Sequence, residues 1–504
     1  MVMAAQSTGT THGTETFDSV NPATSEVVGT FGIYGEQDVA DTVERAREAA
    51  RWWAGLGWKE RERRLLAWKS HLIRYVGRIA ELVHNETGKP LADAQLEVVL
   101  AVVHIDWAAK NARRVLRPRR VRSGLVSINQ AATVEYQPLG VVGVIGPWNY
   151  PVFTPAGSIA YALAAGNAVV FKPSEFTPAV GGWLVSSFAE VVPEQPVLQL
   201  VTGYGPTGDL LARSGVDKIA FTGSTATAKK VMAACAQNLT PMVAECGGKD
   251  ALLVGADADL DAAADACAWG ALSNAGQTCI GIERVYVAQD VFHTFLEKLT
   301  ERAGRVRPGS DREAGYGPMT MPGQIDVIEQ HVADALARGG RPVVGGMASI
   351  RRPYVDPVVL ADVPEESRAV IEETFGPTVT VSRVADLAEG VALANAGQYG
   401  LGAAVFSGNR KAAMSAARSL RSGMTAINGA LTFAAIPALP FGGSGDSGFG
   451  RVHGADGLRE FTRPKAIARQ RMKPMANVSS LDRTDQDMTK LLGVATFLHG
   501  RRYR

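Results

Sequence analysis

The sequence predicts an α/β fold that consists of two α/β domains and a separate β arm. The chain has 504 residues, more than one hydrophobic core usually organises. From Val141 onward, short apolar runs alternate with longer helical stretches, as in parallel strands joined by crossover helices. A small, alternating segment at residues 124–140 interrupts this rhythm and indicates a hairpin.

The composition excludes several classes of protein. Hydrophobic residues make up 46% and charged residues 20% of the chain, and the formal net charge is +2. This balance gives no electrostatic basis for binding nucleic acid or an anionic membrane. Four cysteines without a CxxC spacing are too few for a disulfide framework, so a reducing, cytoplasmic location is expected, and no metal site is expected.

Neither end of the chain, nor the apolar run at 426–443, is predicted to cross a membrane. Residues 1–16 lack the features of a signal peptide and are predicted to be a disordered arm. The apolar run at 426–443 contains prolines and glycines, which favours a buried loop over a membrane span. The tail 472–504 ends in an apolar and then basic stretch. A docked terminal segment is favoured there, and association with a membrane surface is the alternative.

The predicted elements follow in chain order. Residues 37–55 and 60–116 show apolar residues at helical spacing and predict amphipathic helices. After the hairpin come the strands VVGVI, AVVF, VLQLV, KIAF, PMVAE and ALLV, and a second α/β series follows from LDAAADACAWGALSNAG and ERVYVA to about Arg451. No linker separates the two series, so the boundary near residues 245–248 is inferred from a change of motifs.

Two glycine-containing segments are candidate phosphate sites. GYGPTG (203–208) matches the dinucleotide fingerprint, although a plain glycine-rich turn is an equally good interpretation. The acidic residue expected on the next strand is missing. That strand ends instead in TGST (222–225), where Ser224 and a helix start form an alternative phosphate site.

Three further segments carry chemically useful side chains. In KPSE (172–175), Lys172 and Glu175 could hold ribose hydroxyls, or the segment is an ordinary strand exit capped by Ser174. Glu245 in ECGGKD ends an apolar strand, where desolvation would raise its pKa toward that of a general base; a plain salt-bridged glutamate is the alternative. Cys279 lies in the polar turn SNAGQTCIGIE (273–283), which favours a nucleophile over an inert packed thiol only in combination with other motifs.

Taken together, seven ordered motifs resemble those of the NAD(P)-dependent aldehyde dehydrogenases. The resemblance covers about residues 17–470. Base and nucleophile are 34 residues apart (279 − 245), as suits this family. The motifs are GPWNYP (146–151), GNAVVFKPSE (166–175), FTGS (221–224), ECGGKD (245–250), GQTC (276–279), EETFGP (372–377) and PFGGSGDSGFGR (440–451).

The resemblance implies an organisation and a chemistry. It implies an aldehyde-dehydrogenase-like fold in which a Rossmann-type NAD-binding domain (17–123 and 141–245) precedes a catalytic domain (246–462). The arm (124–140 and 463–471) would mediate a homodimer or homotetramer. Cys279 would attack the aldehyde, Asn149 would hold the oxyanion, and Glu245 would activate the water that hydrolyses a thioester. NAD is the expected cofactor, with NADP as an alternative, and its implied contacts are Trp148, Lys172, Glu175, Gly205, Gly208, Gly223, Ser224, Glu373 and Phe375.

The sequence departs from the family pattern in ways that bear on its substrate. Cys246 follows the general base directly, where the family usually has leucine. Ser158 and Val452 occupy positions of a proton relay, and Gly157 and Ser273 stand where succinate-semialdehyde enzymes often carry arginines. A medium-sized apolar or aromatic aldehyde is therefore expected, in a pocket built from Phe153, Trp269, Phe433 and Ile436. A CoA-acylating dehydrogenase and a non-catalytic family member are the competing interpretations.

Overall fold

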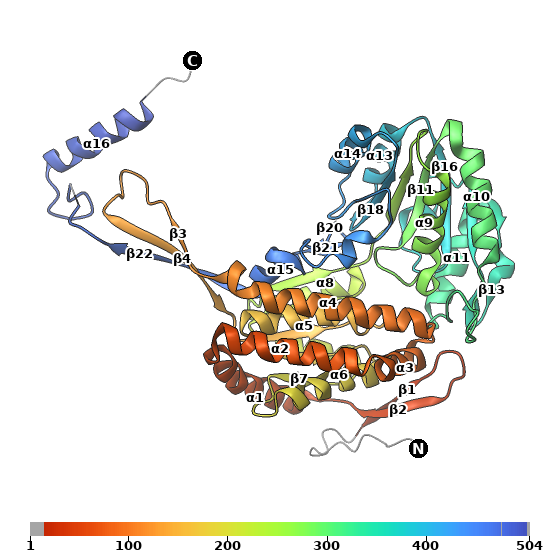
Figure 1. The fold of residues 1–504 in the computed structure, drawn as a ribbon, viewed down its shortest axis with the longest axis horizontal. Coiled ribbons are helices and arrows are strands. Elements are labelled where there is room, and N and C mark those ends of the chain that lie inside the picture. The colour runs from red at the N-terminus through yellow and green to blue at the C-terminus, as the bar shows by residue number, and fades with distance from the viewer. Residues whose placement is uncertain (1–14, 475, 501–504) are drawn as a thin grey trace.

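The computed structural model describes residues 15–474 and 476–500. Figure 1 shows two α/β bodies, one formed mainly by the first half of the chain and one by the second half. A long antiparallel arm leaves the first body and carries the C-terminal helix beyond it. The predicted α/β fold with two α/β bodies and a β arm is confirmed.

The first body begins with a hairpin and a layer of helices. Apolar side chains at helical spacing, such as Val39, Val43, Ala46 and Trp53, bury one face of the first helix. The helical stretch predicted at 60–116 is divided into three helices, because Gly88 adopts φ 74° and caps one of them and Pro90 begins the next. The elements are β1 (Thr16–Val20), β2 (Val27–Gly32), α1 (Glu36–Gly55), α2 (Gly57–Arg74), α3 (Val76–Thr87) and α4 (Leu91–Leu116).

A six-stranded sheet forms the centre of the first body. Its order is β21-β9-β8-β5-β6-β7, and all pairs except β21–β9 are parallel. The strand order reverses between β5 and β8, which are parallel, so the carboxyl ends of these two strands border the crevice where such sheets bind ligands. The elements are β5 (Val141–Ile145), α5 (Phe153–Ala165), β6 (Ala168–Lys172), α6 (Pro178–Val191), β7 (Leu198–Leu200), α7 (Gly205–Arg213), β8 (Lys218–Thr222), α8 (Thr225–Ala236), β9 (Met242–Glu245) and β21 (Gly448–Phe449).

The second body has a seven-stranded sheet of order β12-β15-β16-β11-β10-β18-β19, in which only β12 is antiparallel. Every residue of β10, β11, β15 and β18 is buried, as expected for a sheet covered on both faces. The elements are β10 (Asp250–Val254), α9 (Leu260–Leu272), η1 (Ser273–Gly276), β11 (Ile282–Ala288), η2 (Gln289–Val291), α10 (Phe292–Arg305), α11 (Gln324–Ala337), β12 (Arg341–Val344), η3 (Met347–Ser349), β13 (Ile350–Arg351), β14 (Tyr354–Val355), β15 (Val358–Ala361), α12 (Arg368–Ile371), β16 (Thr378–Val384), α13 (Leu387–Ala396), β17 (Tyr399–Gly400), β18 (Ala403–Phe406), α14 (Arg410–Ser419), β19 (Ala426–Ile427), η4 (Thr432–Ala435) and β20 (Ser444–Gly445).

The predicted boundary of the second domain at residue 462 is wrong. Strand β21 pairs with β9 of the first sheet, and α15 (Gly454–Glu460) packs against α4 and α5. The chain therefore returns to the first body before the arm, because its last buried side chains, such as Leu458 and Phe461, belong to that core. The apolar run 426–443 is a loop with one short strand and one 3-10 turn, and none of the described helices is long and apolar enough to cross a membrane.

The arm is a three-stranded antiparallel sheet. Strands β4 (Gln130–Pro138) and β22 (Thr462–Gln470) pair along their whole length, and β3 (Arg119–Val121) pairs with the other side of β4. The hairpin predicted at 124–140 thus begins too late: its first strand precedes residue 124, and Gly124 lies in the connecting segment with φ 74°. The second segment of the arm lies within one residue of its predicted bounds.

The interpretation of the C-terminal tail as a docked segment is wrong. Helix α16 (Asp485–His499) is capped by Thr484 but buries none of its residues, and Leu492 and Phe497 are exposed. It lies beyond the arm, away from both bodies (Figure 1). At the other end, the predicted disordered arm 1–16 falls mostly outside the described residues, and β1 already starts at Thr16.

Candidate active site

A cavity of about 310 Å³ contains both reactive side chains predicted from the sequence. Cys279 and Glu245 line it, together with Cys246 beside the glutamate. Its walls come from α4, α5, the ends of β8 and β9, the cysteine turn and the loops at 430–435 and 441–453. The exposed surface of the wall is mainly apolar, and the apolar residues that line it are Leu96, Leu100, Phe153, Trp269, Ile280, Ala430, Leu431, Ala434, Ala435, Phe441 and Val452.

The cysteine turn owes its shape to left-handed backbone conformations. Asn274, Ala275 and Gly276 have φ of 53°, 57° and 68°. A Cβ on Gly276 would lie 2.0 Å from the carbonyl oxygen of Gly376, so only glycine fits there. The side chain of Gln277 completes the turn, because its Oε1 accepts from Thr320 N at 2.9 Å and its Nε2 donates to Asn274 O at 2.9 Å.

Cys279 follows this turn and is partly exposed to the cavity. Burial raises the pKa of its thiol, and the carboxyl groups of Glu373, Asp250 and Glu245 raise it further. The neutral thiol is therefore the resting form, and a base is needed for nucleophilic attack.

Asn149 does not line the cavity but contacts the cysteine turn. Its Nδ2 donates to Gln277 O at 2.9 Å, two residues before Cys279. This bond uses one of two N–H groups of the amide. The carbonyl oxygen of Asn149 accepts from Lys89 Nζ at 2.7 Å and from Asn274 Nδ2 at 3.2 Å, so its backbone is held from two sides.

Sequence reasoning missed a buried ion pair behind Asn149. Lys89 Nζ lies 2.7 Å from Glu97 Oε2, and both side chains are almost fully buried. Glu97 Oε1 accepts from the backbone N–H groups of Val152 and Phe153 at 2.7 and 3.1 Å. The pair thereby holds the segment after β5 against α4. Glu97 on the apolar face of a predicted helix, between Ala94 and Ala101, was the signal available in the sequence.

Glu245 ends β9 and is buried, with only 5% of its surface exposed. Neither of its carboxylate oxygens has a hydrogen-bond partner among the described residues. Burial raises its pKa well above the ordinary value, and the nearby charge of Arg451 opposes this effect. The salt-bridged alternative is not what the structure contains, since no described cation lies within ion-pair distance.

The residues predicted to bind the dinucleotide lie at the carboxyl ends of β6, β7 and β8. Lys172 is buried, which lowers its pKa, and its Nζ donates to Pro173 O at 3.0 Å, leaving further donor capacity. Glu175 accepts from Ser174 Oγ at 3.2 Å and is partly exposed. Ser224 caps α8 through Thr227 N at 3.3 Å, with Gly223 just before it.

The two glycines of the first motif differ in their surroundings. Gly205 opens α7 and has open space where a Cβ would stand, whereas a Cβ on Gly208 would touch the Lys172 side chain. An open helix start beside a lysine with spare donors fits a nucleotide phosphate. The residues present therefore fit NAD or NADP.

Trp148, Glu373 and Phe375 are the remaining predicted cofactor contacts, and two of them touch each other. The rings of Trp148 and Phe375 meet edge to face with centroids 5.6 Å apart. Glu373 Oε1 accepts from Gly248 N at 2.9 Å, and burial raises the pKa of Glu373 to about 8. A Cβ on Gly247 would lie 2.1 Å from a Glu373 oxygen, which explains the paired glycines after the base.

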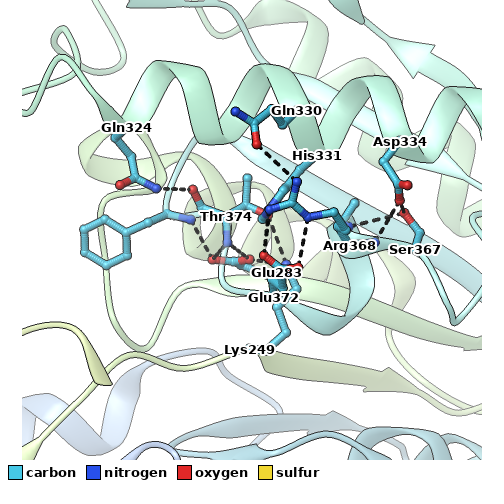
Figure 2. Close-up of polar contacts among 12 residues, drawn as sticks. Lys249, Glu283, Gln324, Gln330, His331, Asp334, Ser367, Arg368, Glu372 and Thr374 are labelled. Atoms are coloured by element: carbon cyan, nitrogen blue, oxygen red, sulfur yellow. Dashed lines mark hydrogen bonds and ion pairs between the residues drawn. The ribbon is translucent and has the colours of Figure 1, made fainter. Parts of the chain in front are cut away.

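Figure 2 shows the buried network that positions this loop. Lys249 pairs with Glu283, whose two oxygens accept from the backbone N–H groups of Thr374 and Phe375 at 2.8 and 3.0 Å. Gln324 Nε2 on α11 donates to Thr374 O at 2.8 Å. A carboxylate with paired backbone donors thus fixes the loop that carries Glu373.

The predicted pocket residues are only partly correct. Phe153 and Trp269 line the cavity, whereas Phe433 is buried in the core and Ile436 is exposed outside the wall. Both belong to an irregular loop whose side-chain directions have no period to predict from. Ser273, Ser158 and Val452 also line the cavity, and Gly157 does not.

Comparison with known proteins identifies the family of this chain. Residues 10–467 match the model of the aldehyde dehydrogenase family. A 4,4'-diapolycopene aldehyde oxidase of Methylomonas sp is 38% identical over 451 residues, covering 89% of this chain and 85% of that protein. A putative succinate-semialdehyde dehydrogenase [NADP(+)] of Mycobacterium ulcerans is 36% identical, over 91% and 89% of the two chains. The crystal structure of an NAD-dependent aldehyde dehydrogenase from Sinorhizobium meliloti superposes with a TM-score of 0.88 at 32% identity, over 93% and 94% of the chains.

Fold and site therefore define an oxidoreductase that acts on aldehydes. The chain belongs to the aldehyde dehydrogenase family.

Proposed function

We propose that the protein catalyses NAD-dependent oxidation of an aldehyde to a carboxylic acid, with release of the acid by hydrolysis. One observation carries this proposal: a free cysteine and a buried glutamate without hydrogen-bond partners line the same cavity. The first supplies a nucleophile and the second a base, which are the two groups that a covalent route to an acid requires.

Cys279 performs the first half of the reaction. The thiol loses its proton to solvent in the cavity, and the thiolate attacks the aldehyde carbon to form a thiohemiacetal. Its oxyanion would accept hydrogen bonds from the Cys279 backbone N–H and from the N–H of Asn149 that does not bind Gln277 O. Bound NAD supplies the hydride acceptor. Transfer of hydride to that acceptor would leave a thioester on Cys279.

Glu245 performs the second half. A carboxylate whose pKa is raised by burial is a stronger base than an exposed one, and Glu245 removes a proton from the water that attacks the thioester. The acid leaves and the thiol returns. Ser158 and Val452 carry no ionisable group, so the proton passes from Glu245 to solvent without a relay through these two positions.

The cofactor assignment rests on Lys172 and Glu175. Both lie at the end of β6, where a carboxylate accepts from a ribose 2′-hydroxyl and repels a 2′-phosphate. This supports NAD over NADP, although one relative is named for NADP.

The substrate is proposed to be a medium-sized aldehyde without negative charge. Of the described residues that line the cavity, Lys89 is the only permanent cation, and its Nζ is bound to Glu97 and Asn149 O. A carboxylate would find no counter-ion there, in contrast to what a succinate-semialdehyde dehydrogenase needs. The apolar walls favour an alkyl or aryl chain.

CoA-dependent acylation is the competing reaction, and replacement of the base separates it from hydrolysis. Glu245→Gln should form about one equivalent of NADH per Cys279 in a rapid burst and then turn over at least a hundredfold more slowly, because the thioester accumulates. Stopped-flow absorbance with acid analysis, with and without CoA, measures both phases, and Cys279→Ala is the control that lacks the burst. Undiminished steady-state turnover of Glu245→Gln would contradict the mechanism.

A further inference from the structure

The cavity wall includes a cluster of polar side chains, on α5 and beside it, that the proposed mechanism does not use. Thr154 and Ser158 lie one turn apart on α5, so both face the same side of the helix, and both line the cavity with His453. No hydrogen bond joins the hydroxyl of Thr154 or Ser158, or the imidazole of His453, to another described residue. Polar groups in a largely buried wall are costly without partners, so their partner is expected to be a ligand.

His453 is held in this position at a conformational cost. Its backbone has φ 62° and ψ 167°, a region that is essentially restricted to glycine. The ring packs against His104, with centroids 3.9 Å apart, and against Phe153 and Phe441. Strain of this kind persists where the surrounding structure imposes it, and it is concentrated at functional sites.

Gly157 makes room for this histidine. A Cβ at position 157 would lie 2.5 Å from His453 Nε2, so no larger residue fits while the imidazole is in place. The imidazole thus occupies the space into which a side chain at 157 would project. The imidazole of His453 therefore lies directly against α5 at Gly157, with its Nε2 toward this helix.

The charge of this wall is zero at neutral pH. Burial lowers the pKa of His453 well below its ordinary value, and burial lowers the pKa of His104 to about 4. A neutral imidazole and two hydroxyls can each donate and accept a hydrogen bond. Such a set matches an uncharged hydroxyl or carbonyl group and offers no positive charge to a carboxylate.

We propose that Thr154, Ser158 and His453 form a subsite for a neutral hydroxyl or carbonyl group carried by the aldehyde substrate. The substrate class is therefore an oxygenated aldehyde with an apolar spacer, rather than a plain alkanal or a semialdehyde acid. This inference rests on the proposed function of the same cavity.

Matched pairs of straight-chain alkanals and ω-hydroxyalkanals of graded length test the subsite, with a semialdehyde acid as the charged comparison. At the length that reaches the subsite, kcat/KM should favour the hydroxyl member by about tenfold, the effect of one or two net hydrogen bonds. The double variant Thr154→Val, Ser158→Ala and the variant His453→Phe should reduce this ratio to within about twofold of unity. His453→Asn, which keeps a polar side chain that tolerates positive φ, should retain part of the preference.

Leu100→Ala is the matched control, because it changes the apolar wall of the same cavity and should affect both members of each pair alike. Turnover of all uncharged aldehydes without preference at any length would overturn the subsite while leaving the proposed function intact. An unchanged preference in the Thr154→Val, Ser158→Ala double variant would also overturn it. If no aldehyde is oxidised at all, the proposed function fails and the subsite falls with it.

Discussion

At the scale of single residues, burial controls the protonation of the two reactive groups. It raises the pKa of Cys279 and the pKa of Glu245, so both are neutral more often than exposed side chains would be. The polar neighbours of Cys279 do not offset this effect, because Asn274 and Gln277 bond to backbone groups of the turn. Their contribution is to position the thiol.

The raised pKa of Glu245 gives a pH prediction. A general base acts only when deprotonated, so turnover limited by thioester hydrolysis should be low below the pKa of Glu245 and should rise tenfold per pH unit until that pKa is passed. This rise should lie well above the range of ordinary carboxyl groups. Steady-state rates across pH measure it, and the same rise in Glu245→Gln would assign it to another group.

Glu175 gives a prediction on cofactor choice. Wild-type protein should use NAD with a higher kcat/KM than NADP, because the carboxylate repels the 2′-phosphate. Glu175→Ser should lower kcat/KM for NAD and raise it for NADP, so that the ratio shifts by at least tenfold. Initial rates with both cofactors measure the ratio, and an NADP-preferring wild-type protein would contradict the assignment.

At the scale of elements, the loop after α12 depends on a buried ion pair. Glu283 neutralises Lys249 and accepts from two backbone N–H groups of the loop (Figure 2). Removing one partner of such a pair leaves an uncompensated buried charge. We expect Glu283→Gln to lower the free energy of unfolding by about 3–5 kcal/mol and to raise the KM for NAD.

Urea denaturation and initial rates test this prediction. Glu372→Gln is the matched control, because that carboxylate lies on the same loop but pairs with Arg368 at the exposed surface. Loss of this surface ion pair should lower the free energy of unfolding by no more than about 1 kcal/mol. Equal effects of the two variants would show that the buried pair does not fix the loop.

At the scale of the whole molecule, the arm exposes its surface to solvent. Eight of the nine residues of β22 are exposed, including Ile467, and an outer strand leaves backbone groups unpaired. A long sheet that packs on neither body (Figure 1) is stabilised best by a second copy of the chain.

We predict a homodimer or homotetramer that depends on this arm. Ile467→Asp should shift the mass in solution toward that of one chain, 53.3 kDa, because a charge would be buried in the contact. Light scattering measures the mass, with Ile467→Val as control. A wild-type protein that is monomeric at micromolar concentration would contradict the prediction.

Features that depend on local sequence patterns could be predicted, and features that depend on contacts between distant segments could not. The strands around Glu245 and Lys172 were predictable because apolar runs ending in polar motifs are local patterns. Contacts between distant segments determine the buried Lys89–Glu97 pair and the position of His453 against Gly157. They also determine that Phe433 is buried in the core and that Ile436 is exposed. No local periodicity encodes such contacts.

The sequence by itself determined the α/β class, the order of the motifs and the identity of Cys279, Glu245 and Asn149 as candidates, since residue type and spacing carry that information. Only the tertiary structure decided that the thiol and the carboxylate share one cavity, that 448–461 returns to the first body and that α16 stays undocked. It also decided that Thr154, Ser158 and His453, whose side chains have no hydrogen-bond partner among the described residues, face the same cavity. These outcomes depend on which surfaces are buried against each other, and burial is a property of the folded chain as a whole.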